Sequence, residues 1–282
     1  MARAPHFSLF NSHDVVVRAL RCASAVRAWF MFYQPFACVA YGAFSFKELV
    51  GIMNNGDYFE KLYATYYSPE MRRIQDQVWQ ILCKDFFTKF LPQETSVAGQ
   101  KKVLVDLAAG GCNFINNIHS GMAEYAFDIN PDVKDFAREG ITAIVDQIGH
   151  LAQHFEEGSV SVFFESNFLE HIDRETIVEL FKTQHRLLRE GGEIWILTPN
   201  IRYFHGAYWD LFDHITPLTE RSLITLAKSL GYKVKVVVPK FIPGQLMYTK
   251  KPKWPWLVAL YLKLMPVSGW FFGEQSFIIL QK

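Results

Sequence analysis

Cysteine is scarce in this chain, with four residues among 282. They stand at Cys22, Cys38, Cys83 and Cys112, and no two of them have the C-x-x-C spacing of a zinc site or a redox motif. The scarcity also argues against a disulfide framework of the kind that stabilises small secreted domains. These absences favour a reducing compartment, and they predict a cytoplasmic protein without a bound metal.

An excess of charge of either sign is also lacking. The chain has 29 Lys and Arg against 28 Asp and Glu, a formal net charge of +1 and a pI of about 7.7. No overall field therefore draws it to nucleic acid or to anionic lipid. No pattern of interleaved basic and aromatic residues predicts a nucleic-acid groove, and no internal repeat or low-complexity tract is present. We therefore expect no nucleic-acid partner.

The length allows one large α/β domain with an extension. We assign residues 1–52 to an N-terminal extension and residues 53–282 to the domain. Arginines precede an uncharged stretch, residues 28–46, that resembles a signal anchor, although Gln34 and Pro35 interrupt it. A membrane-associated segment and a disordered or non-native extension are both compatible with this pattern, and the second is favoured.

A helix is predicted at the start of the domain. Ser68, Pro69 and Glu70 have the order of an N-cap, a first-turn proline and an acid that complements the helix dipole. Apolar residues then recur at intervals of three and four up to Phe90, and Pro92 ends the helix.

Short apolar runs alternate with helical patterns after this helix. The runs are Val103–Leu107, Ala126–Phe127, Thr142–Val145, Val160–Phe164, Ile194–Leu197, Val234–Val238 and Phe277–Leu280. Such alternation indicates βαβ crossovers. The predicted fold is α/β, with a doubly wound, mostly parallel seven-stranded sheet that carries helices on both faces.

A loop of small residues, "DLAAGGCNF", follows the first strand. Ligands of a doubly wound sheet lie beyond the carboxyl ends of its strands. Small residues at Ala108, Gly110 and Gly111 let backbone N–H groups approach a ligand closely. The glycines lack the G-x-G-x-x-G spacing of a dinucleotide site, which argues against a nicotinamide-dependent oxidoreductase.

Polar residues also stand at the ends of the next strands. Asp128 lies 128 − 106 = 22 positions after Asp106, near the offset of about 20 residues at which an acid binds ribose hydroxyls. Asp146 follows "TAIV" and is placed to reach an adenine, and Asn167 follows "FFES". Each acid alone could be a helix cap or a turn residue, but together they form an ordered set at successive strand ends.

These motifs resemble the class I S-adenosylmethionine-dependent methyltransferases. The resemblance covers roughly Tyr58 to Lys282 and includes "VLVDLAAGGCNF", "YAFDINP", "SVFFESNFLEHI", "LLREGGEIWILTPNIRYF" and "HITPLTERSLITLAKSLGYKV". The family's usual loop is D-x-G-x-G-x-G, so Ala108 and Cys112 stand where glycine is common, and Gly110 matches.

The resemblance implies S-adenosylmethionine as cofactor and methyl transfer as the activity. By analogy, Asp106 and the backbone of Gly110 and Gly111 face the methionine part, Asp128 faces the ribose, and Asp146 faces the adenine. The physical chemistry agrees, because carboxylates attract a sulfonium and an ammonium but would repel the pyrophosphate of a dinucleotide.

Candidate catalytic residues follow the fifth strand. We favour His214 as a general base or acceptor-orienting residue, with Asp210 or Asp213 to orient it, because histidine accepts protons near neutral pH. His171 in "NFLEHI" is the second choice. A well-packed loop without a catalytic role is an equal alternative, and methyl transfer also gains much from proximity alone.

Residues 241–274 are predicted to form a lid-like insertion before the last strand. Lysines and tryptophans precede the apolar run "WLVALYLKL". The stretch could cover the acceptor, contact a lipid surface or form a dimer face. Packing against the N-terminal helix is the alternative.

The leading hypothesis is therefore methyl transfer to a small-molecule acceptor, such as a glycan or a secondary metabolite. The rivals are a nicotinamide-dependent oxidoreductase and a non-catalytic binding protein on the same fold, which fold analogy alone would not separate. The sequence predicts no oligomeric state.

Overall fold

The computed structural model describes residues 69–97, 99–244 and 254–282, and all of them belong to one compact unit. The predicted extension over residues 1–52, the domain start at residue 53 and the N-cap at Ser68 lie outside the described residues. Among the residues that are described, no helix has the length and apolar character needed to cross a bilayer.

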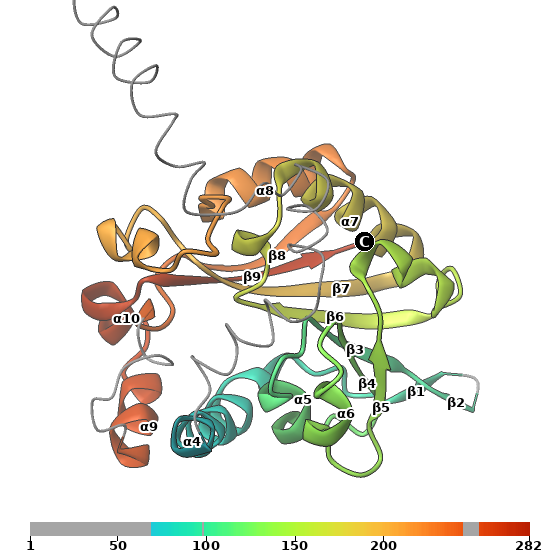
Figure 1. Cartoon of the computed structure of the whole chain (residues 1–282), viewed down its shortest axis with the longest axis horizontal. Coiled ribbons are helices and arrows are strands. Elements are labelled where there is room, and N and C mark those ends of the chain that lie inside the picture. Colours follow the sequence, from blue (N-terminus) through green and yellow to red (C-terminus); the bar gives the residue numbers. More distant parts are fainter. Residues whose placement is uncertain (1–68, 98, 245–253) are drawn as a thin grey trace, which may run out of the picture. The chain divides into compact units, whose positions relative to one another are not determined.

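A seven-stranded sheet forms the centre of the fold (Figure 1). Its strand order is β5-β4-β3-β6-β7-β9-β8, and the first five of these strands are parallel. The bounds are β3 Val103–Leu107, β4 Ala123–Asp128, β5 Thr142–Val145, β6 Val160–Ser166, β7 Leu188–Pro199, β8 Lys233–Val238 and β9 Gln275–Gln281. β9 runs antiparallel to both β7 and β8. The predicted mostly parallel sheet of seven strands is confirmed.

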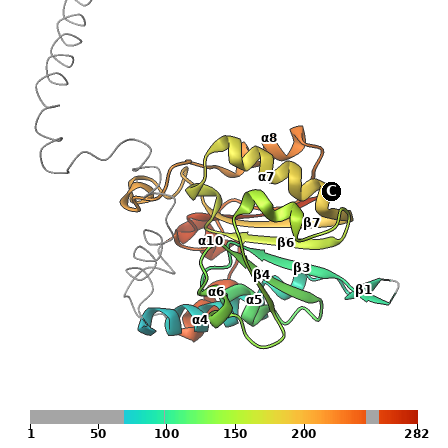
Figure 2. The ribbon, with the colours of Figure 1, turned by 45° about the vertical axis from the view of Figure 1, so that its right-hand side comes forward.

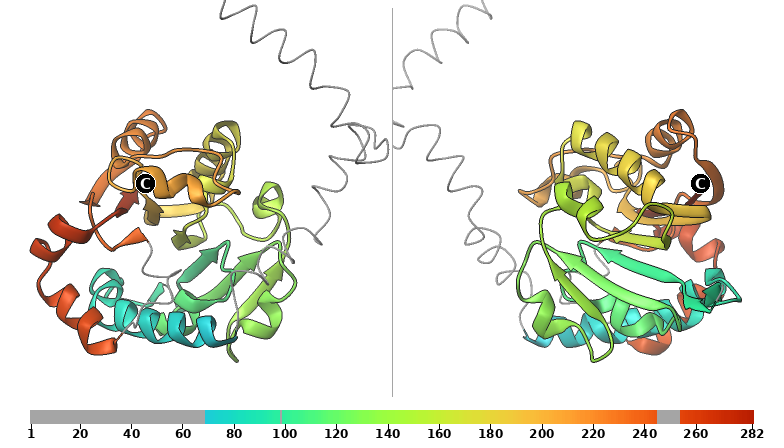
Figure 3. Two further views of the ribbon diagram at one scale, coloured as in Figure 1. Left: turned by 60° about the vertical axis from the view of Figure 1, so that its left-hand side comes forward. Right: turned by 90° about the vertical axis from the view of Figure 1, so that its right-hand side faces the viewer.

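Helices cover both faces of the sheet, as predicted (Figures 2 and 3). One face carries α4 (Pro69–Asp85), α5 (Asn113–Ile118) and α9 (Pro255–Lys263), which pack with the sheet in one apolar cluster. The other face carries α7 (Arg174–Leu187) and α8 (Glu220–Ser229), whose apolar residues form a second cluster. Other short helices include α6 Val133–Phe136, η2 Ile148–Gln153 and α10 Val267–Phe272.

The first helix ends earlier than its apolar spacing predicted. α4 stops at Asp85, and a 3-10 turn, η1, continues over Phe87–Phe90. Phe86 contacts the rings of Phe241 and Phe277 from distant parts of the chain. Tertiary packing of these aromatic rings accounts for the change of helix type. The short hairpin of β1 (Ser96–Val97) and β2 (Gln100–Lys101) was not predicted.

The order of the strands fixes where a ligand can bind. β3 pairs with β4 on one side and with β6 on the other, so the chain turns in opposite directions from β3 and from β6. In open α/β sheets the binding site lies at this switch point, beyond the carboxyl ends of the strands. The loops after β3, β4, β5, β6 and β7 therefore meet at one edge.

The described part of the 241–274 insertion packs against the first helix. Val258 and Leu262 of α9 are buried in the same apolar cluster as Val78 and Leu82 of α4. Tyr261 adds a hydrogen bond from its hydroxyl to the Phe241 carbonyl, at 2.8 Å. Of the arrangements that the sequence left open, the structure shows packing against α4 for the inner face of α9.

Candidate functional site

Left-handed backbone conformations shape the loop that joins β3 to α5. Ala108, Gly110 and Cys112 have φ angles of 56°, 51° and 57°. Such angles are easy for glycine and costly for residues with a Cβ. The loop thus takes a glycine-like path at Ala108 and Cys112, the two positions where this sequence departs from the usual loop.

Asp128 holds this loop in place. Its Oδ2 accepts a hydrogen bond from the Gly110 N–H at 2.7 Å, and its Oδ1 accepts one from the Asn130 N–H at 2.8 Å. The side chain is 4% exposed, and burial raises its pKa against the lowering effect of these hydrogen bonds. The predicted ribose-binding acid therefore sits at the tip of β4, in direct contact with the predicted methionine-binding loop.

Asp106 has a different environment. Its carboxylate is buried and accepts a hydrogen bond from the Ile115 N–H of α5 at 3.3 Å. Burial raises its pKa well above the ordinary value, and the charge of Asp128 adds to this shift. Asp106 thus joins the end of β3 to the first turn of α5.

The loop has open space where a ligand must approach. A Cβ on Gly110 would meet no atom within 4 Å, whereas one on Gly111 would lie 3.2 Å from Nδ2 of Asn113. Bare backbone and a nearby carboxylate suit a cationic, phosphate-free ligand. The residues present therefore fit the amino-acid and nucleoside parts of S-adenosylmethionine.

Asp146 lies between two histidines after β5. Its Oδ1 is 2.9 Å from Nδ1 of His150, and its Oδ2 is 2.7 Å from Nε2 of His154. These hydrogen bonds, that of His154 first, lower the Asp146 pKa to about 2. The Asp146 N–H donates to the Asp128 carbonyl at 3.0 Å, which places the predicted adenine residue beside the predicted ribose residue.

Asn167 follows β6 with a strained backbone. Its φ angle is 50°, and its N–H donates to the Leu197 carbonyl at 2.8 Å. The side-chain Oδ1 is buried without a hydrogen-bond partner. Strain and an unpaired polar atom at a strand end are typical of functional positions.

The predicted catalytic histidines lie side by side. Their ring centroids are 4.9 Å apart, although His171 follows β6 and His214 follows β7. Asp213 pairs with His171, whose Nδ1 is 3.2 Å from Oδ2 and 3.1 Å from the backbone oxygen. Burial is the largest single influence and lowers the pKa of His171, but the hydrogen bonds to Asp213 and the charges of Glu170 and Asp213 together outweigh it, so the net shift is upward.

The acids expected to orient His214 form no hydrogen bond or ion pair with it among the described residues. Asp213 contacts His171, and no hydrogen bond or ion pair between Asp210 and either histidine is found in the described part of the chain. His214 Nδ1 is buried without a partner, and burial lowers the His214 pKa to about 4. His214 is therefore neutral at pH 7, and Asp210 is exposed on the adjacent turn η4 (Gly206–Asp210).

Glu170 is a site residue that the sequence did not predict. It is 0% exposed in the turn η3 (Leu169–His171). Its Oε2 accepts a hydrogen bond from the Thr198 hydroxyl at 3.0 Å, and its Oε1 has no partner. Glu170, His171 and His214 each offer a donor atom, and these atoms lie within 4.8 Å of one another. Sequence spacing could not reveal this group, because His214 is 214 − 171 = 43 positions from His171.

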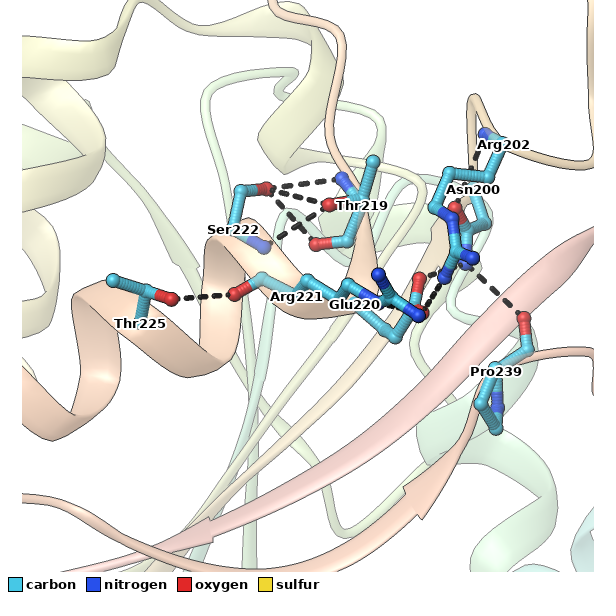
Figure 4. A network of polar contacts seen from close by, with 8 residues as sticks. All are labelled: Asn200, Arg202, Thr219, Glu220, Arg221, Ser222, Thr225 and Pro239. Atoms are coloured by element: carbon cyan, nitrogen blue, oxygen red, sulfur yellow. Dashed lines mark hydrogen bonds and ion pairs between the residues drawn. The ribbon is translucent and has the colours of Figure 1, made fainter.

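A buried polar network fixes the loop that carries His214 (Figure 4). Asn200 donates from Nδ2 to Glu220 at 2.6 Å and to the Pro239 carbonyl at 3.2 Å, and Arg202 forms an ion pair with the same Glu220. The network therefore joins the two ends of the loop, since Asn200 directly follows β7 and Glu220 starts α8.

The capping residues of α8 complete this support. The Thr219 hydroxyl accepts from the Ser222 N–H, and the Ser222 hydroxyl accepts from the Thr219 N–H, both at 3.0 Å (Figure 4). This reciprocal arrangement satisfies two backbone donors at the helix start. The Glu170 carbonyl also accepts from the Ile215 and Thr216 N–H groups, which ties the loop to η3.

Residues 105–196 match the family model of a methyltransferase domain. This span starts in β3, ends in β7 and contains the loop, Asp128, Asp146, Asn167 and His171. These residues therefore form a methyltransferase domain, similar to that of the class I S-adenosylmethionine-dependent methyltransferases. The match indicates methyl transfer as the activity of this domain, with S-adenosylmethionine as its cofactor.

One solved methyltransferase structure supports the fold, and a second one aligns less well. A methyltransferase from Archaeoglobus fulgidus that depends on S-adenosylmethionine aligns with a TM-score of 0.56 and 17% identity, over 80% of this chain and 100% of that one. One from Mesorhizobium loti has a TM-score of 0.49 and 17% identity, over 70% and 96%. A search of curated proteins finds no match.

Proposed function

We propose that this methyltransferase acts on a small molecule that offers a hydroxyl oxygen, such as a sugar or a secondary metabolite. The observation that carries the proposal is the histidine pair at the carboxyl edge of the sheet. His171 and His214 follow β6 and β7, whereas Asp128 and the Gly110 loop follow β4 and β3. Groups that can hold a polar acceptor thus share an edge with groups that fit the cofactor.

The cofactor residues are proposed as the resemblance implies. Asp128 takes the ribose hydroxyls, Asp146 lies at the adenine, and the backbone around Ala108, Gly110 and Gly111 approaches the methionine part. Asp106 supports the loop indirectly, because its carboxylate accepts a hydrogen bond from the Ile115 N–H and so fixes α5. Asn167 offers its unpaired Oδ1 to the cofactor as a hydrogen-bond acceptor. When bound, S-adenosylmethionine supplies the methyl group and the sulfur leaving group.

The two histidines orient the acceptor in this proposal. His171 is held by Asp213, and His214 is held between the rings of His171 and Tyr208, at centroid distances of 4.9 and 4.4 Å. With its pKa at about 4, His214 is a weak proton acceptor at neutral pH, so we favour an orienting role over a general-base role. The role of Asp210 in orienting His214 stays a prediction.

Calorimetry and turnover together test the proposal. We expect His214→Ala to bind S-adenosylhomocysteine as tightly as the natural enzyme, and to lose about a hundredfold in turnover on a responsive sugar or alcohol, because misplaced reactants cost that much. His205→Ala is the matched control, since His205 is an exposed histidine of the same loop. If His214→Ala turned over the acceptor as fast as His205→Ala does, the orienting role would be contradicted.

The extent and location of the enzyme are also proposals. Residues 53–282 form the cofactor-binding domain, and the scarcity of cysteine supports a cytoplasmic location. A variant without residues 1–52 should bind S-adenosylhomocysteine with unchanged affinity. Loss of binding in that variant would show that the extension belongs to the domain.

A further inference from the structure

Three side chains at the acceptor edge have the composition of a metal site. They are the Glu170 carboxylate and the imidazoles of His171 and His214, with donor atoms within 4.8 Å of one another. One carboxylate and two imidazoles suit a divalent transition metal such as zinc, manganese, iron or cobalt. A site with three protein ligands leaves positions open for substrate, as in catalytic metal sites.

Two buried atoms of this group have no hydrogen-bond partner. They are Oε1 of Glu170 and Nδ1 of His214, on side chains that are 0% and 5% exposed. A buried polar atom without a partner is costly, so natural structures rarely keep one unless something binds there. A cation is one ligand that would satisfy both a carboxylate oxygen and a neutral imidazole nitrogen.

The surroundings of His171 match those of a metal ligand. Its Nδ1 faces Asp213, at 3.2 Å from the carboxylate Oδ2. Metal-binding histidines almost always give their second ring nitrogen to such a carboxylate or carbonyl, which fixes the ring and the tautomer. Glu170 is similarly held by the Thr198 hydroxyl through its other oxygen.

We propose that Glu170, His171 and His214 bind a divalent cation whose open positions take the hydroxyl oxygen of the acceptor. The metal site deepens the proposed function. Metal binding is independent of that function, and only the role of the metal in catalysis rests on it. A coordinated hydroxyl loses its proton to water more readily. Its oxygen then forms a bond to the methyl carbon while the carbon–sulfur bond breaks, and the electron pair stays on sulfur. The products are a methyl ether, S-adenosylhomocysteine and a proton.

Cobalt titration of the full chain tests the site without any acceptor. We expect one Co²⁺ to bind with visible absorption bands, and Zn²⁺ to displace it. Glu170→Gln and His214→Gln should each weaken Co²⁺ binding about a hundredfold while S-adenosylhomocysteine still binds. If these two buried variants do not fold, His171→Gln, at a partly exposed position, replaces them in the Co²⁺ titration.

The control is the double variant His150→Gln, His154→Gln, which removes the other histidine pair that faces a carboxylate. Absence of cobalt binding, equal binding in the Glu170 variant, or loss only in the control would overturn the site. Cobalt binding with turnover that a chelator does not change would overturn the catalytic role alone. Failure of the proposed function would appear differently, as missing turnover with every hydroxyl acceptor.

A second, independent feature is an apolar surface on α9 and α10, which lie together at one edge of the molecule (Figures 1 and 3). We call it the α9–α10 surface. Its side chains are between 43% and 72% exposed: Trp254, Trp256, Leu257, Leu260, Leu264, Val267, Trp270, Phe271 and Phe272. Contiguous exposed apolar surface of this kind marks an interaction site.

The fold imposes this outward arrangement. The inner face of α9 is buried on α4, so Leu257 and Leu260 must face outward. α10 is held close to the end of β8, since a Cβ on Gly269 or Gly273 would lie 2.3 or 2.5 Å from the Lys240 carbonyl oxygen. Trp270 and Phe271 of α10 are 72% and 70% exposed.

Charge identifies the partner of the α9–α10 surface. Lys240 lies over the Trp270 ring at 5.6 Å, and Lys263 is exposed at the end of α9. In the sequence, five lysines and no acid occur from Pro239 to Gly273. Tryptophan, phenylalanine and lysine together are typical of segments that lie in the interface of an anionic bilayer. We infer that the α9–α10 surface docks on anionic lipid membranes.

Vesicle sedimentation tests this inference with the full chain. We expect binding to phosphatidylcholine vesicles that contain phosphatidylglycerol, and weaker binding without it or at high salt. The double variant Trp270→Ser, Phe271→Ser should bind at least about tenfold more weakly, because each lost aromatic anchor removes buried apolar area. Trp209→Ser is the matched control, an exposed tryptophan elsewhere. Unchanged vesicle binding in the double variant, or a dimer of the natural chain that the variant dissociates, would overturn it.

Discussion

Asp128 and Gly110 are joined by a 2.7 Å hydrogen bond from the Gly110 N–H to Oδ2 of Asp128. This contact links the tip of β4 to the loop after β3, so one carboxylate both shapes the loop that we propose for the methionine part and stands where we propose that the ribose binds. The tip of β4 and the loop after β3 are therefore fixed to each other before a cofactor binds.

Replacing Asp128 should therefore weaken cofactor binding in two ways. Asp128→Ala removes the acceptor for ribose hydroxyls and releases the Gly110 loop. A hydrogen bond to a charged group contributes about 1.5–3 kcal/mol, so affinity for S-adenosylmethionine should fall tenfold or more in calorimetry. Asp132→Ala is a suitable control, because Asp132 is exposed on the next turn. Equal affinity in a folded Asp128 variant would refute the assignment.

Ala108 gives a test of backbone strain. Its φ of 56° costs about 1–2 kcal/mol for a residue with a Cβ. Ala108→Gly relieves this strain but adds freedom to the unfolded chain, so its melting temperature should stay close to the natural value. Ala108→Val should melt at a clearly lower temperature, since a β-branched residue resists positive φ. A Gly variant as unstable as the Val variant would show that side-chain contacts matter more.

Glu165 predicts how stability depends on pH. It is buried in β6 without a partner for either oxygen, and burial raises its pKa to about 8. Between about pH 4.5 and 8 the unfolded chain has lost this proton while the folded chain keeps it, so this group lowers the free energy of unfolding as pH rises. Denaturant unfolding should show the decline in the natural protein.

Glu165→Gln separates this effect from other titrations. The amide cannot ionise, so the variant should gain stability relative to the natural protein as pH increases from 5 to about 8. Glu156→Gln, at an exposed acid with no hydrogen bond from its side chain among the described residues, is the control. A difference between Glu165→Gln and the natural protein that does not vary with pH would contradict the raised pKa.

The network around Glu220 predicts that removing one of its hydrogen bonds lowers the free energy of unfolding. Asn200 is 0% exposed and donates to Glu220 at 2.6 Å. Asn200→Ala leaves that buried carboxylate with one fewer donor and should cost about 1.5–3 kcal/mol in chemical unfolding. Lys228→Ala, at an exposed side chain of α8 away from Glu220, should change stability by less than about 0.5 kcal/mol. Similar costs for both variants would argue against the network.

Local patterns in the sequence determined the sheet and half of the site. Apolar runs placed all seven strands, because the central strands are buried and the edge strands β5 and β8 still carry runs of apolar residues. The strand ends then gave Asp106, Asp128 and Asp146, since parallel strands bring their carboxyl ends to one edge. The structure places Asp128 against the loop, as that logic requires.

Only the tertiary structure decided which residues meet across long separations. It paired Asp213 with His171 instead of His214, and it placed Glu170 beside both histidines. It also ended α4 at Asp85, where distant aromatic rings pack. These outcomes depend on how loops from different strands fold over the same edge, and spacing along one chain carries no information about such contacts. The sequence therefore defines the sheet and its cofactor edge, and the packing of its loops defines the acceptor site.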